Sequence, residues 1–193
     1  MGTISPDTVQ KLYVKVDRES SAIPKICKKG CFACCFQPIE IFTFEKPILE
    51  GFIKNQMNEE QRNSISERTV LWLDFFNKNT SNIEPLSPHE AFVNFRSKAE
   101  RIPFPCPLLI DGKCSVYKAR PLGCRTHSVN DDKKNCEIDK LRNSSEDSMQ
   151  LRSYAIQILK NGGVSLEVVP LTYALVEILG VNRQLKKIEL ARM

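Results

Sequence analysis

A chain of 193 residues with 41% hydrophobic and 26% charged side chains can bury a core without disulfide staples, so we expect one globular domain over residues 1–193. No apolar run approaches the ~20 residues that cross a bilayer, and the first residues lack the apolar core of a secretion signal. We therefore expect a cytoplasmic protein with no membrane partner. The net charge of +5 sits in scattered pairs such as Lys28/Lys29, without a run of aromatic and basic residues, which argues against nucleic acid as a partner.

The first helix is predicted from its start signal. Ser5 offers a capping side chain, and Pro6 suits the first helical position. Apolar residues then recur on one face, so we expect a helix that ends near Ser21. The chain next reaches the stretch Cys-Lys-Lys-Gly-Cys-Phe-Ala-Cys-Cys at residues 27–35, where the glycine permits the tight backbone that lets several thiols converge.

Three more helices are predicted before residue 102. Thr43 reads as the cap of a helix whose inner face carries Leu49 and Ile53. Asn58, with Gln61 three residues later, opens the next helix. That helix should supply the largest buried surface of the chain, from Ile65, Leu71, Trp72, Phe75 and Phe76. A capping box at residues 87–90 begins a third helix that runs to residue 101.

Residues 103–141 differ from the rest of the chain in their prolines, glycines and four cysteines, and show little helical periodicity. An irregular segment of this length is unusual in a compact domain unless it is functional. After it, Ser145 begins a helix that closes at Gly162, and Pro170 starts the last helix or helix pair. The pattern predicts a mainly α, single helical domain framing a cysteine-rich metal centre built from two irregular loop segments.

The eight cysteines are the candidate metal ligands. In a reducing compartment they are free thiols or ligands rather than disulfides, and thiolates clustered along a chain are typical of zinc or iron–sulfur sites. The candidates are Cys27, Cys31, Cys34, Cys35, Cys106, Cys114, Cys124 and Cys136. Because neighbouring side chains point apart, Cys34 and Cys35 both serve as ligands only if the site is polynuclear or double.

Several metal arrangements fit this count. Two Cys₄ zinc sites, one four-iron cluster with four cysteines left over, or a mixed arrangement remain open. The single Cys-x-x-Cys pair, Cys31 to Cys34, lacks the second close pair of most zinc sites, which favours an iron–sulfur cluster over Zn²⁺. With Cys27, this spacing is also that of radical S-adenosylmethionine enzymes, in which one iron stays open. The chain is too short for their usual barrel, so the spacing only hints at an open iron.

Three separated motifs carry a resemblance. They are Cys-x₃-Cys-x₂-Cys-Cys at residues 27–35, Cys-Pro-Leu-Leu at residues 106–109 and Arg-Pro-Leu-Gly-Cys-Arg at residues 120–125. Together they resemble the YkgJ-like cysteine-cluster family, the CxxCxxCC zinc- or iron-chelating domain, over roughly residues 27–136. The resemblance implies metal chelation. One branch, the flagellin lysine N-methylases, pairs a similar cluster with methyl transfer, but those proteins are much longer.

Three further residues are candidates for the site. Arg120 and Arg125 are predicted to bind the cofactor by donating to its sulfurs, unless they fix loop carbonyls instead. His127, three residues after Cys124, either replaces a cysteine as ligand or lies beside the metal. The sequence contains no Gly-rich phosphate loop and no nucleophilic serine motif. It leaves two functions open, a metal-binding protein of structural type or a cluster-dependent enzyme, and names no partner.

Overall fold

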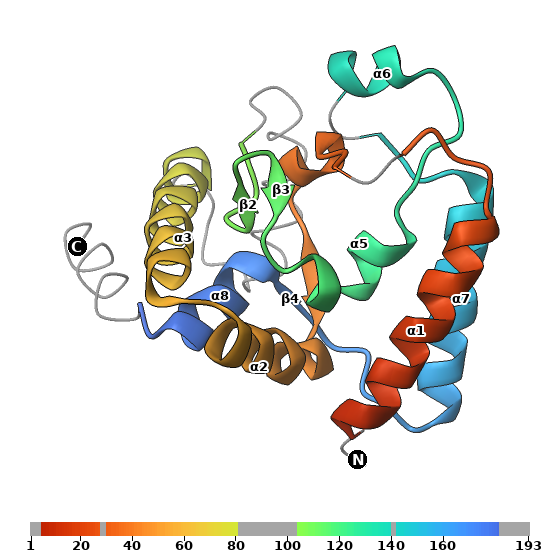
Figure 1. The fold of residues 1–193 in the computed structure, drawn as a ribbon, viewed down its shortest axis with the longest axis horizontal. Coiled ribbons are helices and arrows are strands. Elements are labelled where there is room, and N and C mark those ends of the chain that lie inside the picture. The colour runs from red at the N-terminus through yellow and green to blue at the C-terminus, as the bar shows by residue number, and fades with distance from the viewer. Residues whose placement is uncertain (1–4, 28–29, 81–103, 140–141, 182–193) are drawn as a thin grey trace.

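The computed structural model describes residues 5–27, 30–80, 104–139 and 142–181, and the chain is mainly helical over these ranges. Two groups of helices lie on opposite sides of the molecule, with β2, β3 and α5 between them (Figure 1). One side holds α1 (Pro6–Ala22) and α7 (Glu146–Asn161). The other holds α2 (Lys46–Gln56), α3 (Glu59–Thr80) and α8 (Leu171–Leu179). The helix predicted over residues 87–101 lies outside the described residues.

The predicted start signals of three helices are confirmed. The Ser5 side chain accepts a hydrogen bond of 3.2 Å from the backbone N–H of Thr8, at the start of α1. Before α3, the backbone N–H of Asn58 donates to the Gln61 side chain, and that of Gln61 donates back to the Asn58 side chain. Ser145 caps α7 in the same way. Each cap satisfies backbone donors that have no partner inside the helix.

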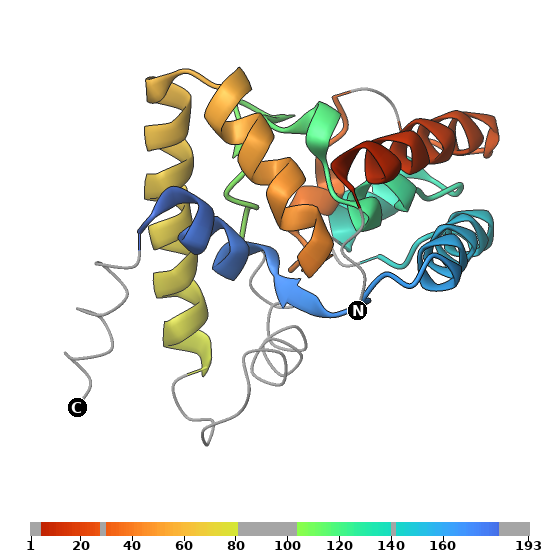
Figure 2. The same ribbon diagram turned by 90° about the horizontal axis from the view of Figure 1, so that it is seen from below.

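The first core lies between α1 and α7. Val9 and Tyr13 of α1 pack against Ala155 and Leu159 of α7, and all four are buried. Leu122, which is completely buried, joins this core from the short helix α5 (Leu122–Thr126). Figure 2 shows α1 and α7 running alongside one another at the end of the molecule opposite α3. Hydrophobic packing therefore holds α5, which contains Cys124, against this helix pair.

The second core joins α2, α3 and α8, and includes one of the cysteines. Leu49, Ile65 and Leu175 are completely buried there, and Cys106 packs among them. Leu71 was predicted to belong to the core of α3, but it is 58% exposed. The reason is helical geometry: at 100° per residue, Leu71 lies well off the buried face of α3.

Two antiparallel strand pairs connect these parts. β1 (Glu40–Phe42) pairs with β4 (Val168–Pro170), with Ile41 opposite Val169. β2 (Leu109–Ile110) and β3 (Lys113–Cys114) form a hairpin that places Cys114 opposite Leu109. Its two turn residues have positive φ, 49° at Asp111 and 69° at Gly112, as a two-residue hairpin requires.

Two boundaries differ from the sequence expectations. The helix expected to start at Thr43 begins at Lys46, because residues Thr43–Glu45 form the 3₁₀ turn η2 first. Residues 103–141 are less irregular than expected, since they contain the β2–β3 hairpin, η3 (Tyr117–Ala119), α5 and α6 (Lys133–Ile138). Helices of five or six residues are too short to show a 3.6-residue period in the sequence. None of the helices described here combines the length and apolar character needed to cross a membrane.

Candidate metal centre

The cysteine motifs, far apart in sequence, converge at the 3₁₀ turn η1 (Ala33–Phe36). The backbone N–H of Cys106 donates to the carbonyl of Cys35 over 2.6 Å, which joins the first motif to the second. The backbone N–H of Ile26, next to Cys27, donates to the carbonyl of Val129 over 3.0 Å. Helix α6, which carries Cys136, packs against η1. The Cys106 segment and α6 therefore both meet η1, and the segment before Cys27 is bonded to the chain that follows α5.

Electrostatic interactions show which thiols lie close together. Burial raises the pKa of the Cys124 thiol well above its usual range. The charges of three nearby thiolates, Cys34, Cys106 and Cys114, act in the same direction. Burial also raises the pKa of Cys106 to about 12. A hydrogen bond to Cys34 and burial raise the pKa of the Cys35 thiol, and the charges of Cys34, Cys106 and Cys124 act in the same direction. We call Cys35, Cys106, Cys114 and Cys124 the inner group.

A second set of thiols lies nearer the surface. Burial raises the pKa of Cys27, and the charges of Cys31, Cys34 and Cys136 act in the same direction. Cys31 is exposed, whereas Cys27 and Cys136 are half-buried. We call Cys27, Cys31 and Cys136 the outer group. The spatial groups thus cut across the two groups seen in the sequence, and Cys34 interacts with both.

Backbone donors stabilise several of these sulfurs as thiolates. The N–H of Leu108 donates to Cys106, and that of Val116 donates to Cys114, in each case two residues further along the chain. The N–H of Val129 donates to Cys27. A hydrogen bond to the charged form of a thiol lowers its pKa. Amide donors of this kind suit sulfurs that bind a metal as thiolates.

The thiols lie near one another but do not form a complete coordination sphere. Over the described residues, no three Cys, His, Asp or Glu side chains stand close enough together to hold a metal ion as they are placed. Cys34 differs from its neighbours in charge: a hydrogen bond from the Cys35 thiol lowers the pKa of Cys34 to about 7, and the charge of Arg120 helps. The Cys34 thiol is therefore ionised to a substantial extent at neutral pH.

Arg120 lies beside these sulfurs. It pairs with Asp17 of α1 at 3.1 Å, and its guanidinium stacks 4.0 Å from the centre of the Tyr117 ring. Its charge opposes the effect of burial on the pKa of Cys114, as it does for Cys34. Its buried Nε–H has no hydrogen-bond partner among the described residues. A buried donor of this kind is costly unless a further acceptor is present, so the surroundings of Arg120 fit an anionic sulfur centre.

Arg125 is engaged with the protein itself. Its side chain is only 2% exposed, and its Nε donates to the carbonyl of Arg120 over 2.8 Å. Its terminal nitrogens donate to Asp17 and to the carbonyl of Lys118, and its guanidinium lies 4.1 Å from the centre of the Tyr13 ring. These contacts hold α5 against α1. A contact between Arg125 and a metal-bound sulfur stays a prediction.

Sequence reasoning missed a buried acidic residue, Glu45. Glu45, which is 1% exposed, accepts hydrogen bonds from the Tyr13 hydroxyl and, over 2.7 Å, from the backbone N–H of Leu122. It also accepts from the N–H of Phe42 over 3.0 Å. The carboxylate thereby connects α1, β1 and the start of α5. The sequence gives no signal for it, because Glu45 lies in a short turn and its partners are 32 and 77 residues away.

His127 lies at a small cavity of about 260 Å³ whose lining includes Cys34 and Cys124. Its Nδ1 lies 2.8 Å from the Ser144 hydroxyl. Burial, together with the charges of Arg152 and Arg142, lowers the pKa of His127 to about 4, so the imidazole is neutral at pH 7. A role of His127 as metal ligand stays a prediction.

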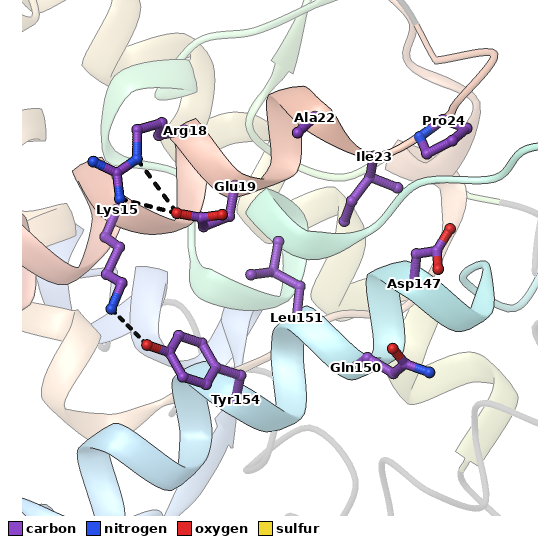
Figure 3. Close-up of a pocket in the computed structure, with 10 residues that line it drawn as sticks. All are labelled: Lys15, Arg18, Glu19, Ala22, Ile23, Pro24, Asp147, Gln150, Leu151 and Tyr154. Carbon is purple, nitrogen blue, oxygen red and sulfur yellow. Dashed lines mark hydrogen bonds and ion pairs between the residues drawn. The ribbon is translucent and has the colours of Figure 1, made fainter.

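A larger groove of about 820 Å³ lies between α1 and α7, away from the cysteines (Figure 3). Three of its charged residues have partners within the groove: Lys15 donates to the Tyr154 hydroxyl over 2.5 Å, and Arg18 pairs with Glu19 at 2.9 Å. None of the eight cysteines lines it. The cavity at His127 is therefore the one that bears on the thiol chemistry.

One comparison with known proteins gives a result. The family model described as "CxxCxxCC: Putative zinc- or iron-chelating domain" matches residues 26–143, more than half of the chain. This range begins one residue before Cys27 and extends past Cys136. No curated protein and no solved structure gives a significant match.

Proposed function

The chain belongs to the CxxCxxCC family of zinc- or iron-chelating domains, and from this premise we propose that its cysteines hold a metal centre between the two helix groups. The inner group, together with Cys34, would form the principal site. The outer group would bind a second metal or complete a polynuclear centre. When bound, an iron–sulfur cluster supplies electron transfer, and Zn²⁺ supplies cross-links or a Lewis acid.

The observation that carries the proposal is the environment of the inner sulfurs. They come from four separate segments, and backbone N–H groups donate to two of them, Cys106 and Cys114. The charge of Arg120 acts on Cys114 and on Cys34, and the buried Nε–H of this arginine lacks an acceptor among the described residues. Ordinary packing of cysteine requires none of these donors, since a buried thiol behaves as a small hydrophobic group.

Between the two metals, we favour the iron–sulfur cluster. Cys106 is 7% exposed and packs within an apolar core, with Cys35 and Cys114 against the same core. Such surroundings screen a cluster from water. The chain also lacks the two close cysteine pairs that are usual in structural zinc sites.

The experiment is anaerobic purification of the full chain from cells supplied with both iron and zinc. We expect a brown protein that contains iron and acid-labile sulfide and whose visible spectrum changes on reduction. Zn²⁺ has a filled d shell and no redox chemistry, so a zinc protein would be colourless. A colourless preparation with about two zinc ions per chain would replace the cluster by two Cys₄ sites. A preparation with neither metal would contradict the proposal altogether.

A second candidate function is an enzyme that uses this centre. The observation that favours it is the cavity of about 260 Å³ whose wall includes Cys34 and Cys124. A binding protein of purely structural type has no need of a cavity beside its metal. The two candidates separate on whether a small molecule binds in this cavity.

A further inference from the structure

An arginine outside the three cysteine motifs contacts a candidate ligand directly. The Nη1 of Arg142 donates to the Cys136 sulfur over 3.6 Å. Cys136 is a half-buried free thiol of the outer group, and the Arg142 side chain is 18% exposed. Arg142 therefore makes the kind of contact with sulfur that the sequence suggested for Arg120 and Arg125.

A carboxylate fixes the guanidinium of Arg142 from the side. The Nη2 of Arg142 donates to Asp131, whereas Nη1 donates to the Cys136 sulfur. The two acceptors use different nitrogens, so the ion pair with Asp131 does not compete for the donor that faces the sulfur. Asp131 also accepts from the Asn135 side chain over 3.3 Å, and Asn135 directly precedes Cys136 in α6. Because a guanidinium is planar and rigid, holding one of its nitrogens fixes the direction of the other.

The backbone of Arg142 is tied to the first cysteine motif. Its carbonyl accepts from the Gln37 side chain over 3.0 Å. Gln37 directly follows the turn η1, which carries Cys34 and Cys35. Helix α6 packs against the same turn. Arg142 thus connects η1 with the sulfur of Cys136.

Such a contact has a defined effect on a metal ligand. A charged N–H donor forms a strong hydrogen bond to an anionic acceptor, and it stabilises a metal-bound thiolate. Donors of this kind also orient the ligand, and their removal typically costs about 10- to 100-fold in metal affinity. Cys136 needs this support because α6 has only six residues, and so short a helix is marginal by itself.

We propose that Arg142 is the positioning residue of the outer group, whose Nη1–H holds the Cys136 sulfur in place as a metal-bound thiolate. The proposal deepens the metal-binding function and rests on it. Cys31 of the same group is exposed, so a competing chelator can reach a metal bound there. The bond between Arg142 and Cys136 would then control how fast the outer group loses its metal.

The test is the loss of metal from the purified full chain to EDTA, under anaerobic conditions, with iron and zinc per chain measured over time. EDTA binds both metals, so the test does not depend on which one the protein holds. Arg142→Gln keeps a neutral donor but removes the charged one, and it should lose metal about five- to tenfold faster than the parent. Arg142→Lys keeps a charged donor and should lose metal at an intermediate rate.

A double variant shows whether Arg142 acts through Cys136. In a Cys136→Ala background the acceptor sulfur is absent, so adding Arg142→Gln should not change metal content or the rate of metal loss any further. A further loss of metal in the double variant would show that Arg142 acts elsewhere, and it would overturn the proposal.

The matched control is Arg62→Gln. Arg62 donates to the carbonyls of Met57 and Lys54, over 2.7 Å and 3.4 Å, and belongs to α3, a helix without a candidate ligand. Urea unfolding of both glutamine variants measures the general cost of removing an arginine that ties segments together. Arg62→Gln should lose metal at the rate of the parent.

The contrary results separate the proposal from the function on which it rests. Metal loss from Arg142→Gln at the rate of the parent or of Arg62→Gln would overturn the role of Arg142 and leave the metal-binding function intact. Equal rates in Arg142→Lys and Arg142→Gln would overturn it as well, because they would leave Arg142 as a structural tie alone. A parent protein that contains neither iron nor zinc at the first time point would instead refute the metal-binding function, and the role of Arg142 with it.

Discussion

The backbone N–H of Cys106 donates to the carbonyl oxygen of Cys35 over 2.6 Å, and this bond joins cysteines that are 71 residues apart. It places the β2–β3 hairpin, with Cys114, against the turn that carries Cys34 and Cys35. The two cysteine motifs of the sequence thereby become one assembly. Four predictions test how this assembly works.

The first prediction concerns the grouping of the thiols. Cys114 and Cys136 belong to the same run of cysteines in the sequence, but to different spatial groups. Cys114→Ser should lose the same share of metal as Cys35→Ser, and Cys136→Ser should match Cys31→Ser, because a hydroxyl is a poor substitute for a soft thiolate. Metal content per chain measures this directly.

The control for these variants is Ala33→Ser. It places the same hydroxyl in η1, beside the cysteines, without removing a thiol. It should retain the metal content of the parent. Equal losses in Cys114→Ser and Cys136→Ser would contradict the spatial grouping.

The second prediction concerns metal removal. Residues 104–139 include few long elements of their own, so ligand bonds should contribute much of their stability. A chelator should therefore speed tryptic cleavage after Lys113 and Lys118, which are both exposed. Cleavage after Lys160 in α7, a helix without a candidate ligand, serves as the internal control. Unchanged cleavage of residues 104–139 would show that metal does not hold this segment.

The third prediction concerns Asp17, which pairs with Arg120 and with the buried Arg125. Asp17→Asn should lower the free energy of unfolding by about 1–2 kcal/mol, since it leaves a buried guanidinium without its counter-charge and Asp17 itself is partly exposed. Asp7→Asn is the matched control. It breaks the Asp7–Lys11 pair, which is exposed to solvent and should contribute nothing measurable.

Urea unfolding of the three proteins at neutral pH provides the comparison. The spectrum or metal content of Asp17→Asn should also change, because Arg120 lies beside Cys34 and Cys114. Equal stability of Asp17→Asn and Asp7→Asn would argue against a role of Asp17 in holding the arginines.

The fourth prediction concerns pH. Burial raises the pKa of Glu45 above its ordinary value of 4.5. A carboxyl group whose pKa is raised on folding contributes stability at low pH and loses that contribution as pH rises through the folded pKa. Glu45→Gln has no such titration. The stability of the parent relative to Glu45→Gln should therefore fall between pH 4 and pH 8.

Urea unfolding of both proteins across this range measures the difference, and the titration of every other group cancels. A difference that stays constant or rises with pH would contradict the raised pKa. Tyr13→Phe, which removes one donor to the carboxylate, should raise the pKa of Glu45 further and extend the fall to higher pH.

Much of the local structure follows from short stretches of sequence. Ser5, Asn58 and Ser145 cap helices through hydrogen bonds to residues three positions away, so their signals are complete within one turn. The choice of thiols as candidate ligands also needs only the composition of the segment. The exposure of Leu71 shows the limit of such reasoning, because an apolar residue in a helical segment need not lie on the face that the helix buries.

The tertiary structure alone decided how the candidate site is assembled. The sequence by itself determined three things: the eight thiols in two runs, the mainly helical frame and the family. It could not assign Cys114 to the inner group or Cys136 to the outer group. Nor could it predict the hydrogen bond from Leu122 to Glu45 or the ion pair between Asp17 and Arg125. These contacts join residues 70 to more than 100 positions apart, and they depend on how α1, α2 and α7 pack, which no local hydrogen-bond or periodicity signal encodes.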